Sequence, residues 1–181
     1  LLPFLGSNSR LSGNTINNYS INMLGGYSLG TRNIELGFFV NMDRGDVSWL
    51  QIAGIGNMVG GRMYGIQLSG FYNINGGETK AVQVSGFTNV NLSEVQGFQI
   101  AGFSNVNVKA SEGLQVAGFT NVGVGRSLGA QIAGAANIQI GMLKGSQFAG
   151  VTNIATDHVR GSQVAGLFNY GHVVHGTQIG L

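Results

Sequence analysis

The chain of 181 residues has no cysteine, one proline, and only nine basic and seven acidic residues. Without cysteine, disulfides and thiolate metal sites are excluded. No stretch approaches the roughly 18 uninterrupted apolar residues of a membrane helix. The few charges form no basic run or stripe, which argues against a nucleic-acid-binding surface.

Glycine, in contrast, is abundant, with 32 residues, and it recurs in step with two amides. Gln recurs every 16 residues, at Gln51, Gln67, Gln83, Gln99, Gln115, Gln131, Gln147 and Gln163. Asn follows each Gln by six residues, at Asn57, Asn73, Asn89, Asn105, Asn121, Asn137, Asn153 and Asn169. A fixed period without insertions marks a repeat architecture.

Each repeat reads Gly-x-Gln-(Ile/Val)-(Ala/Ser)-Gly-(Phe/Ile/Leu)-x-Asn-(Val/Ile), followed by six variable residues. The glycines and β-branched residues disfavour helices, and 16 residues accommodate two short strands and two turns. From Trp49 onward, every charged side chain falls in the variable segment: Arg62, Glu78, Lys80, Glu94, Lys109, Glu112, Arg126, Lys144, Asp157 and Arg160. The sequence therefore predicts an all-β fold, a parallel β-solenoid of stacked 16-residue coils.

Stacking explains the two amides. Equivalent residues of successive coils would lie about 4.8 Å apart, so that each amide can donate to one neighbour and accept from the other. A buried amide without partners costs roughly 1–3 kcal/mol. We therefore interpret the sixteen Asn and Gln residues as structural ladder residues and not as ligands.

Strict alternation along one strand would place large apolar residues on both of its faces. Two arrangements resolve this. A corner at the Ala-Gly pair resets the alternation, so that Ile, Phe and Val all point inward, with Gly supplying a positive φ; alternatively, one face is an apolar contact surface. We favour the corner, although an exposed Phe stripe would mark a binding site.

The repeat fades toward the N-terminus, where Glu35 and Asn41 occupy the Gln and Asn positions of a degenerate first coil. We expect residues 1–33 to form an N-terminal cap with an edge strand. Residues 34–181 would form the solenoid of about nine coils, the last incomplete, because the spacing falls to 15 between Gln163 and Gln178. An uncovered final edge would favour a protein partner or self-association.

No catalytic constellation is visible, because no Ser stands in a nucleophile elbow and no carboxylate recurs near a histidine. His158, His172 and His175 cluster near Asp157, and imidazoles can bind metal. Since no other repeat carries such a set, we interpret them as surface-loop residues. We expect no enzyme activity, cofactor or metal.

The units at 99–106 (Gln-Ile-Ala-Gly-Phe-Ser-Asn-Val) and 115–122 (Gln-Val-Ala-Gly-Phe-Thr-Asn-Val) resemble the surface-repeat proteins of Gram-negative bacteria, especially Bacteroidota and spirochaetes. The resemblance covers about residues 34–181. It implies export to the cell surface, the outer membrane or the extracellular space, with no established catalytic activity. Any outer-membrane association would come from segments outside this chain.

The leading hypothesis is a non-enzymatic rigid scaffold or binding platform on a bacterial outer membrane. One alternative is a curli-like, amyloid-type fibre subunit that stacks through its C-terminal edge. A lower alternative is an antiparallel outer-membrane barrel of hairpins, disfavoured because membrane strands need about 9–11 residues each.

Overall fold

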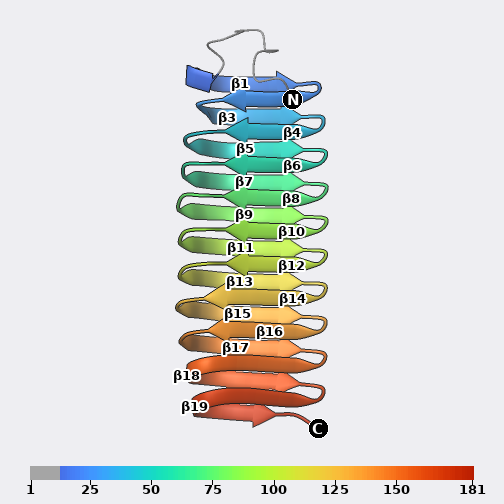
Figure 1. Ribbon diagram of the computed structural model, residues 1–181, viewed down its shortest axis with the longest axis vertical. Helices are drawn as coiled ribbons and strands as arrows, with labels where there is room; N and C mark the ends of the chain where they lie inside the picture. Colours follow the sequence, from blue (N-terminus) through green and yellow to red (C-terminus); the bar gives the residue numbers. More distant parts are fainter. Residues whose placement is uncertain (1–12) are drawn as a thin grey trace.

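The computed structural model describes residues 13–181, which form a straight rod of stacked coils (Figure 1). Each coil has one long and one short strand, which lie in two facing sheets. Every strand pairing is parallel, so the predicted parallel β-solenoid is confirmed and the antiparallel hairpin alternative is wrong. Among the described residues, no helix is long and apolar enough to cross a bilayer.

The long strands form one ladder: β1 (Ile16–Asn22), β3 (Gly30–Gly37), β5 (Val47–Ala53), β7 (Met63–Ser69), β9 (Thr79–Ser85), β11 (Val95–Ala101), β13 (Ser111–Ala117), β15 (Ser127–Ala133) and β17 (Leu143–Ala149). The short strands form the other: β2 (Gly25–Ser28), β4 (Val40–Asp43), β6 (Gly56–Val59), β8 (Tyr72–Asn75), β10 (Thr88–Asn91), β12 (Ser104–Asn107), β14 (Thr120–Val124) and β16 (Ala136–Ile140). Two strands bend round a corner and belong to both ladders: β18 (Thr152–Ala165) and β19 (Phe168–Ile179).

The register places identical residues above one another. Asn89 pairs with Asn105, and Gln99 pairs with Gln115. About ten coils with a spacing of about 4.8 Å give a rod roughly 48 Å long. The register shifts between β18 and β19, at Ala155 and His158, which accounts for the 15-residue spacing at Gln178.

The coils begin before the first recognisable repeat. β1 and β2 pair in parallel with β3 and β4, so residues 16–28 of the segment predicted as a cap continue the stack. Residues 1–12 of that segment lie outside the described residues. The repeat is not evident in the sequence of this segment, because Gly26 stands at the Asn position. In the structure, the side chain of Asn22 fills the space beside Gly26.

The interior is polar and much of the outer surface is apolar. In the coil of β11 and β12, Gln99 and Asn105 are fully buried, whereas Ile100 is 45% and Phe103 is 40% exposed. The favoured orientation, with Ile, Phe and Val inward, is therefore wrong. The corner does not reset the alternation: Gln99, Ala101 and Asn105 are all buried, and only Phe103, at the corner, turns outward. Because Gln and Asn alternate with Ile and Val, an interior that holds both amide rows cannot also hold the aliphatic rows.

The corner glycines are required for a different reason from the one expected. They do not have a positive φ. A methyl group on Gly102 would instead overlap the backbone oxygen of Gly86 in the preceding coil. Positive φ occurs elsewhere, at a long-strand position occupied by Gly97 and Gly113, and Trp49 adopts it at the equivalent place with a φ of 79°.

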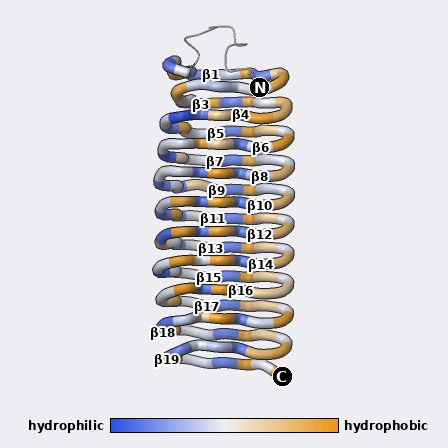
Figure 2. The backbone as a smooth tube through the Cα atoms, viewed as in Figure 1, coloured by the Kyte–Doolittle hydropathy of each residue, from blue (hydrophilic) through white to orange (hydrophobic). Residues whose placement is uncertain are grey.

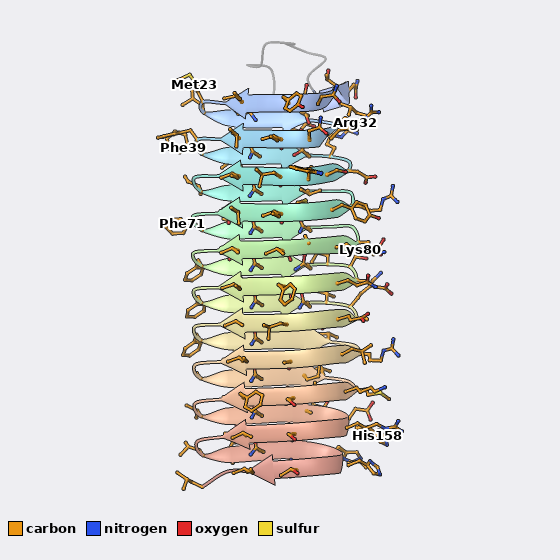
Figure 3. All side chains as sticks on the ribbon, turned by 180° about the vertical axis from the view of Figure 1, so that it is seen from behind. Met23, Arg32, Phe39, Phe71, Lys80 and His158 are labelled. Atoms are coloured by element: carbon orange, nitrogen blue, oxygen red, sulfur yellow. The ribbon has the colours of Figure 1, made fainter. Side chains whose placement is uncertain are left out.

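The two edges of the rod differ in chemistry (Figure 2). The Phe edge is formed by the residue after each corner position, which is Phe38 in the coil of β3 and β4 and glycine in the later coils: Phe39, Ile55, Phe71, Phe87, Phe103, Phe119, Ala135, Val151 and Leu167. The charged edge is formed by the variable segments. Figure 3 shows Met23, Phe39 and Phe71 along one edge, and Arg32, Lys80 and His158 along the opposite one.

Candidate functional site

The Asn side chains form a continuous hydrogen-bonded ladder along the interior. From Asn41 to Asn153, each Nδ2 donates to the Oδ1 of the Asn in the next coil over 2.8–3.0 Å. Each Nδ2 also donates to a backbone carbonyl, as Asn105 does to the oxygen of Val116 at 2.8 Å. The second bond fixes the orientation of the amide, so the ladder runs in one direction only.

The Gln side chains form a second ladder, which runs the opposite way. Gln83 Nε2 donates to Gln67 Oε1 at 3.0 Å, and Gln163 Nε2 donates to Gln147 Oε1 at 2.7 Å, each toward the N-terminus. Within residues 13–181, a direct hydrogen bond joins each pair of successive Gln side chains from Gln51 to Gln163, except the pair Gln99 and Gln115. All sixteen predicted ladder residues therefore lie in two interior rows, half-buried at Asn169 and buried elsewhere.

A third amide row was missed by the sequence reasoning. Asn75, Asn91 and Asn107 lie on the short strands and reach across the interior to the Gln row. Asn107 Nδ2 donates to Gln99 Oε1 at 2.7 Å, and Gln99 Nε2 donates back to Asn107 at 3.2 Å. The sequence does indicate this row, because three consecutive repeats carry Asn at the same position. That position falls in the six-residue segment interpreted as variable.

Two carboxyl groups are buried at the N-terminal end of these rows. Glu35 occupies the Gln row, and Asp43 occupies the third row. Gln51 Nε2 donates to both, at 2.8 Å each, and Ser28 Oγ donates to Asp43 Oδ1 at 2.5 Å. Asn22 Nδ2 donates to Glu35 Oε1 at 3.1 Å. The described partners of this pair include no basic side chain.

A proton on Asp43 takes the place of a counter-ion. Burial raises the pKa of Asp43 to about 9, with further contributions from the hydrogen bond to Glu35 and from the charge of Glu35. Each of the four carboxyl oxygens accepts one bond, and every donor is an uncharged amide or hydroxyl, so a proton on Asp43 is what limits the buried negative charge.

The charged edge carries solvated ion pairs. Arg62 donates two guanidinium bonds to Asp46 Oδ2, at 2.8 and 3.1 Å, and these bonds lower the pKa of Asp46. His158 Nδ1 lies 2.5 Å from Asp157 Oδ1 and lowers the pKa of that carboxyl. His158, His172 and His175 are exposed at this edge. Across residues 13–181, no group of three or more His, Asp or Glu side chains could hold a metal ion.

The ladder predicts a strong dependence on position. Asn105→Ala leaves Asn121 Oδ1 and the Val116 carbonyl without their donor, and Asn89 loses one of its two bonds. We expect the free energy of unfolding to fall by about 3 kcal/mol. Asn169→Ala, at a half-buried position, should cost about 1 kcal/mol. Urea denaturation measures both, and equal losses would contradict the ladder.

The carboxyl pair predicts a stability that falls as the pH rises. The pKa of Asp43 is raised from 3.8 to about 9 on folding, so between these values the folded protein holds a proton that the unfolded chain has lost. The free energy of unfolding should decrease through this window by at most about 1.4 kcal/mol per pH unit. Asp43→Asn places there the amide found at Asn75 and Asn91, and should remove most of this slope.

Urea denaturation between about pH 5 and pH 9 measures that slope. Asp46→Asn is the matched control, because its carboxyl is exposed and its pKa is lowered by Arg62, so its effect belongs to acid pH. An Asp43→Asn protein with the parent slope would show that the pair does not hold the proton.

Comparison with known proteins gives no match from which a function could be proposed. No protein-family model, no curated protein and no solved structure matches this chain. Function must therefore be argued from the two amide ladders, the charged edge and the Phe edge.

Proposed function

We propose that the chain is a non-enzymatic, surface-exposed repeat protein that acts as a rigid scaffold and binding platform on a bacterial outer membrane. The observation that supports this most directly is the separation of constant from variable residues. The Gln row, the Asn row and the corner glycines repeat in all eight coils from Gln51 to Asn169, whereas the exposed side chains of the charged edge differ from one coil to the next.

Rigidity comes from the way each coil is held. Every coil is bonded to its neighbours through two strand ladders and through the amide rows between them. The corners are bonded as well, since Gly102, Phe103 and Ser104 all donate backbone N–H groups to the preceding coil. A rod built in this way sets the distance between whatever is attached at its two ends.

The charged edge supplies the variable surface for binding. Its side chains project from turns, as at Glu94 and Lys109, or outward from strands, as at Glu112, so that a substitution there does not disturb the interior amides. Successive coils present Glu94, Lys109 with Glu112, and Arg126 at this edge, and the order of charges is specific to this chain. Such a surface suits recognition of a protein partner with a complementary charge pattern.

A fibre subunit remains a second candidate. The in-register stacking of identical side chains within the chain is the arrangement that amyloid-type fibres extend between chains. Filament growth that depends on concentration, with thioflavin binding, would support this alternative, and a monomer that persists at high concentration would exclude it.

A modular spacer predicts that whole coils can be removed. Deleting residues 98–113 joins Gly97 to Leu114 and brings Gln83 directly under Gln115. We expect a folded rod shortened by about 4.8 Å. Deleting only residues 98–105 moves later residues half a coil out of step, and should abolish cooperative folding. Small-angle X-ray scattering and circular dichroism distinguish these outcomes, and equal tolerance of both deletions would contradict the spacer.

Surface exposure is tested on intact cells. Lys109 and Lys144 are exposed at the charged edge, so a membrane-impermeant amine reagent should modify them before lysis. The Lys109→Gln and Lys144→Gln double variant is the control that identifies these sites by mass spectrometry. Modification seen only after lysis would reject the surface location and leave the rod geometry untouched.

A further inference from the structure

Apolar side chains cover three contiguous sides of the rod. In the coil of β11 and β12, Phe98 and Ile100 face outward from the long strand, Phe103 stands on the Phe edge, and Val106 faces outward from the short strand. Phe98 is 53% exposed. Single exposed apolar residues are ordinary on a protein surface, but contiguous rows over several coils mark a surface that contacts something else.

The rows are regular as well as apolar. The rings of Phe87, Phe103 and Phe119 stack with centroids 4.8 and 5.0 Å apart and planes within 6° of parallel. On the short-strand face, Met42, Met58 and Ile74 line a shallow apolar groove of about 490 Å³. Methionine side chains are flexible, so such a groove adapts its shape to an apolar partner.

The backbone N–H groups near the Phe edge are already satisfied within the rod, whereas the buried hydroxyls of Ser69 and Ser85 have no hydrogen-bond partner among the described residues. The backbone N–H of Phe103 donates to Phe87 at 2.9 Å, and that of Gly102 donates to Ser85 at 3.1 Å. The hydroxyl of Thr88 donates to the backbone oxygen of Ser104 at 2.9 Å, and Thr120 repeats this contact with Ala136. The backbone donors of the Phe edge can therefore leave water without losing a partner, which is the main condition for contact with hydrocarbon.

The charge distribution fits the same environment. Throughout residues 13–181, the exposed charges lie at the charged edge, and Glu35 and Asp43 are buried. No charged residue lies between Glu94 and Lys109, and the five steps from Phe98 to the Phe edge at Phe103 span at most about 16 Å. One leaflet of a bilayer provides about 15 Å of hydrocarbon, half of the full core.

We propose that the rod lies along a lipid bilayer, with its Phe edge and the two adjoining apolar faces inserted into one leaflet and the charged edge in the headgroup region. A lipid leaflet covers all three apolar sides at once. A second copy of the chain, packed on one sheet face, would leave the Phe edge and the other face in water. The proposal does not depend on the scaffold role, because the purified protein would bind lipid whatever it carries.

Flotation with phosphatidylcholine vesicles tests the proposal. The protein should float with the vesicles without anionic lipid, because the charged edge carries both signs and no basic patch is required. Replacing Phe87, Phe103 and Phe119 by Ser should lower the partition coefficient at least about tenfold. The matched control replaces Glu94, Lys109 and Arg126 by Ser, one in each of the same coils, and should change partitioning less than about threefold.

A pair of single-tryptophan proteins places the contact without removing the Phe row. Both carry Trp49→Gly, which removes the one native tryptophan and restores the glycine found at Gly65 and Gly97. One adds Phe103→Trp on the Phe edge, and the other adds Lys109→Trp on the charged edge. Lipid with brominated acyl chains should quench the first strongly and the second weakly. This comparison decides the matter if the triple Ser variant does not fold, which circular dichroism reports.

Two results would overturn the proposal. In one, the parent protein does not float, or both tryptophans are quenched alike. In the other, light scattering shows a stable dimer in water that does not bind vesicles, which would assign the apolar sides to a second copy of the chain.

Discussion

The hydrogen bond between side-chain amides of successive coils is the interaction on which the rest of the structure depends. Its net contribution is modest, about 1 kcal/mol per bond, but an interior amide that loses its neighbour costs roughly 1–3 kcal/mol. The ladder therefore acts mainly by excluding alternatives. A coil of another length would displace every later Asn and Gln from its partner unless the strand shifts register, as β19 does before Gln178 donates to Gln163 at 2.6 Å. The constant 16-residue period between Gln51 and Gln163 follows from this penalty.

A polar interior determines what lies outside. Side chains alternate along a strand, so placing Gln99 inside places Ile100 outside, and placing Asn105 inside places Val106 outside. The usual arrangement of a small protein, with apolar residues inside, is inverted here. Apolar interior residues are confined to small clusters such as Val47 with Met63, where no amide occupies the space. The apolar sides and the charged edge are thus two consequences of one choice of interior.

The sequence predicts the period, the parallel stacking, the ladder residues and the edge that carries charge, because each depends on positions repeated eight times. It does not decide which side of the strand faces inward, since alternation is equally consistent with both. That choice depends on which set of side chains can be satisfied in the interior, and the two amides, which cannot be buried alone, settle it. The sequence predicts correctly that these glycines lie at corners, but the expected reason, a positive φ, is wrong. The observed reason is the close approach of backbones in neighbouring coils, which cannot be recognised from the sequence of a single repeat.

The buried carboxyl pair escaped sequence analysis because Glu35 and Asp43 look like exceptions within a degenerate coil. In the structure, a carboxylate that accepts and does not donate gives the Gln ladder its direction. Gln51 must turn its Nε2 toward Glu35 and Asp43, so its Oε1 is left to accept from Gln67. Each later Gln inherits this orientation, and Gln131 still donates to Gln115 beyond the missing step.

The Asn ladder points the other way because each Asn gives its second N–H to a backbone carbonyl. The amide dipoles of the Gln row therefore oppose those of the Asn ladder along the axis, and the third row, from Asn75 to Asn107, points the same way as the Asn ladder. The amides carry no net charge, whatever the number of coils or the residues at the edges. Repeats can therefore be added or varied without changing the charge of the interior. The raised pKa of Asp43 belongs to the same balance, because two buried negative charges would have no cation among the described partners to offset them.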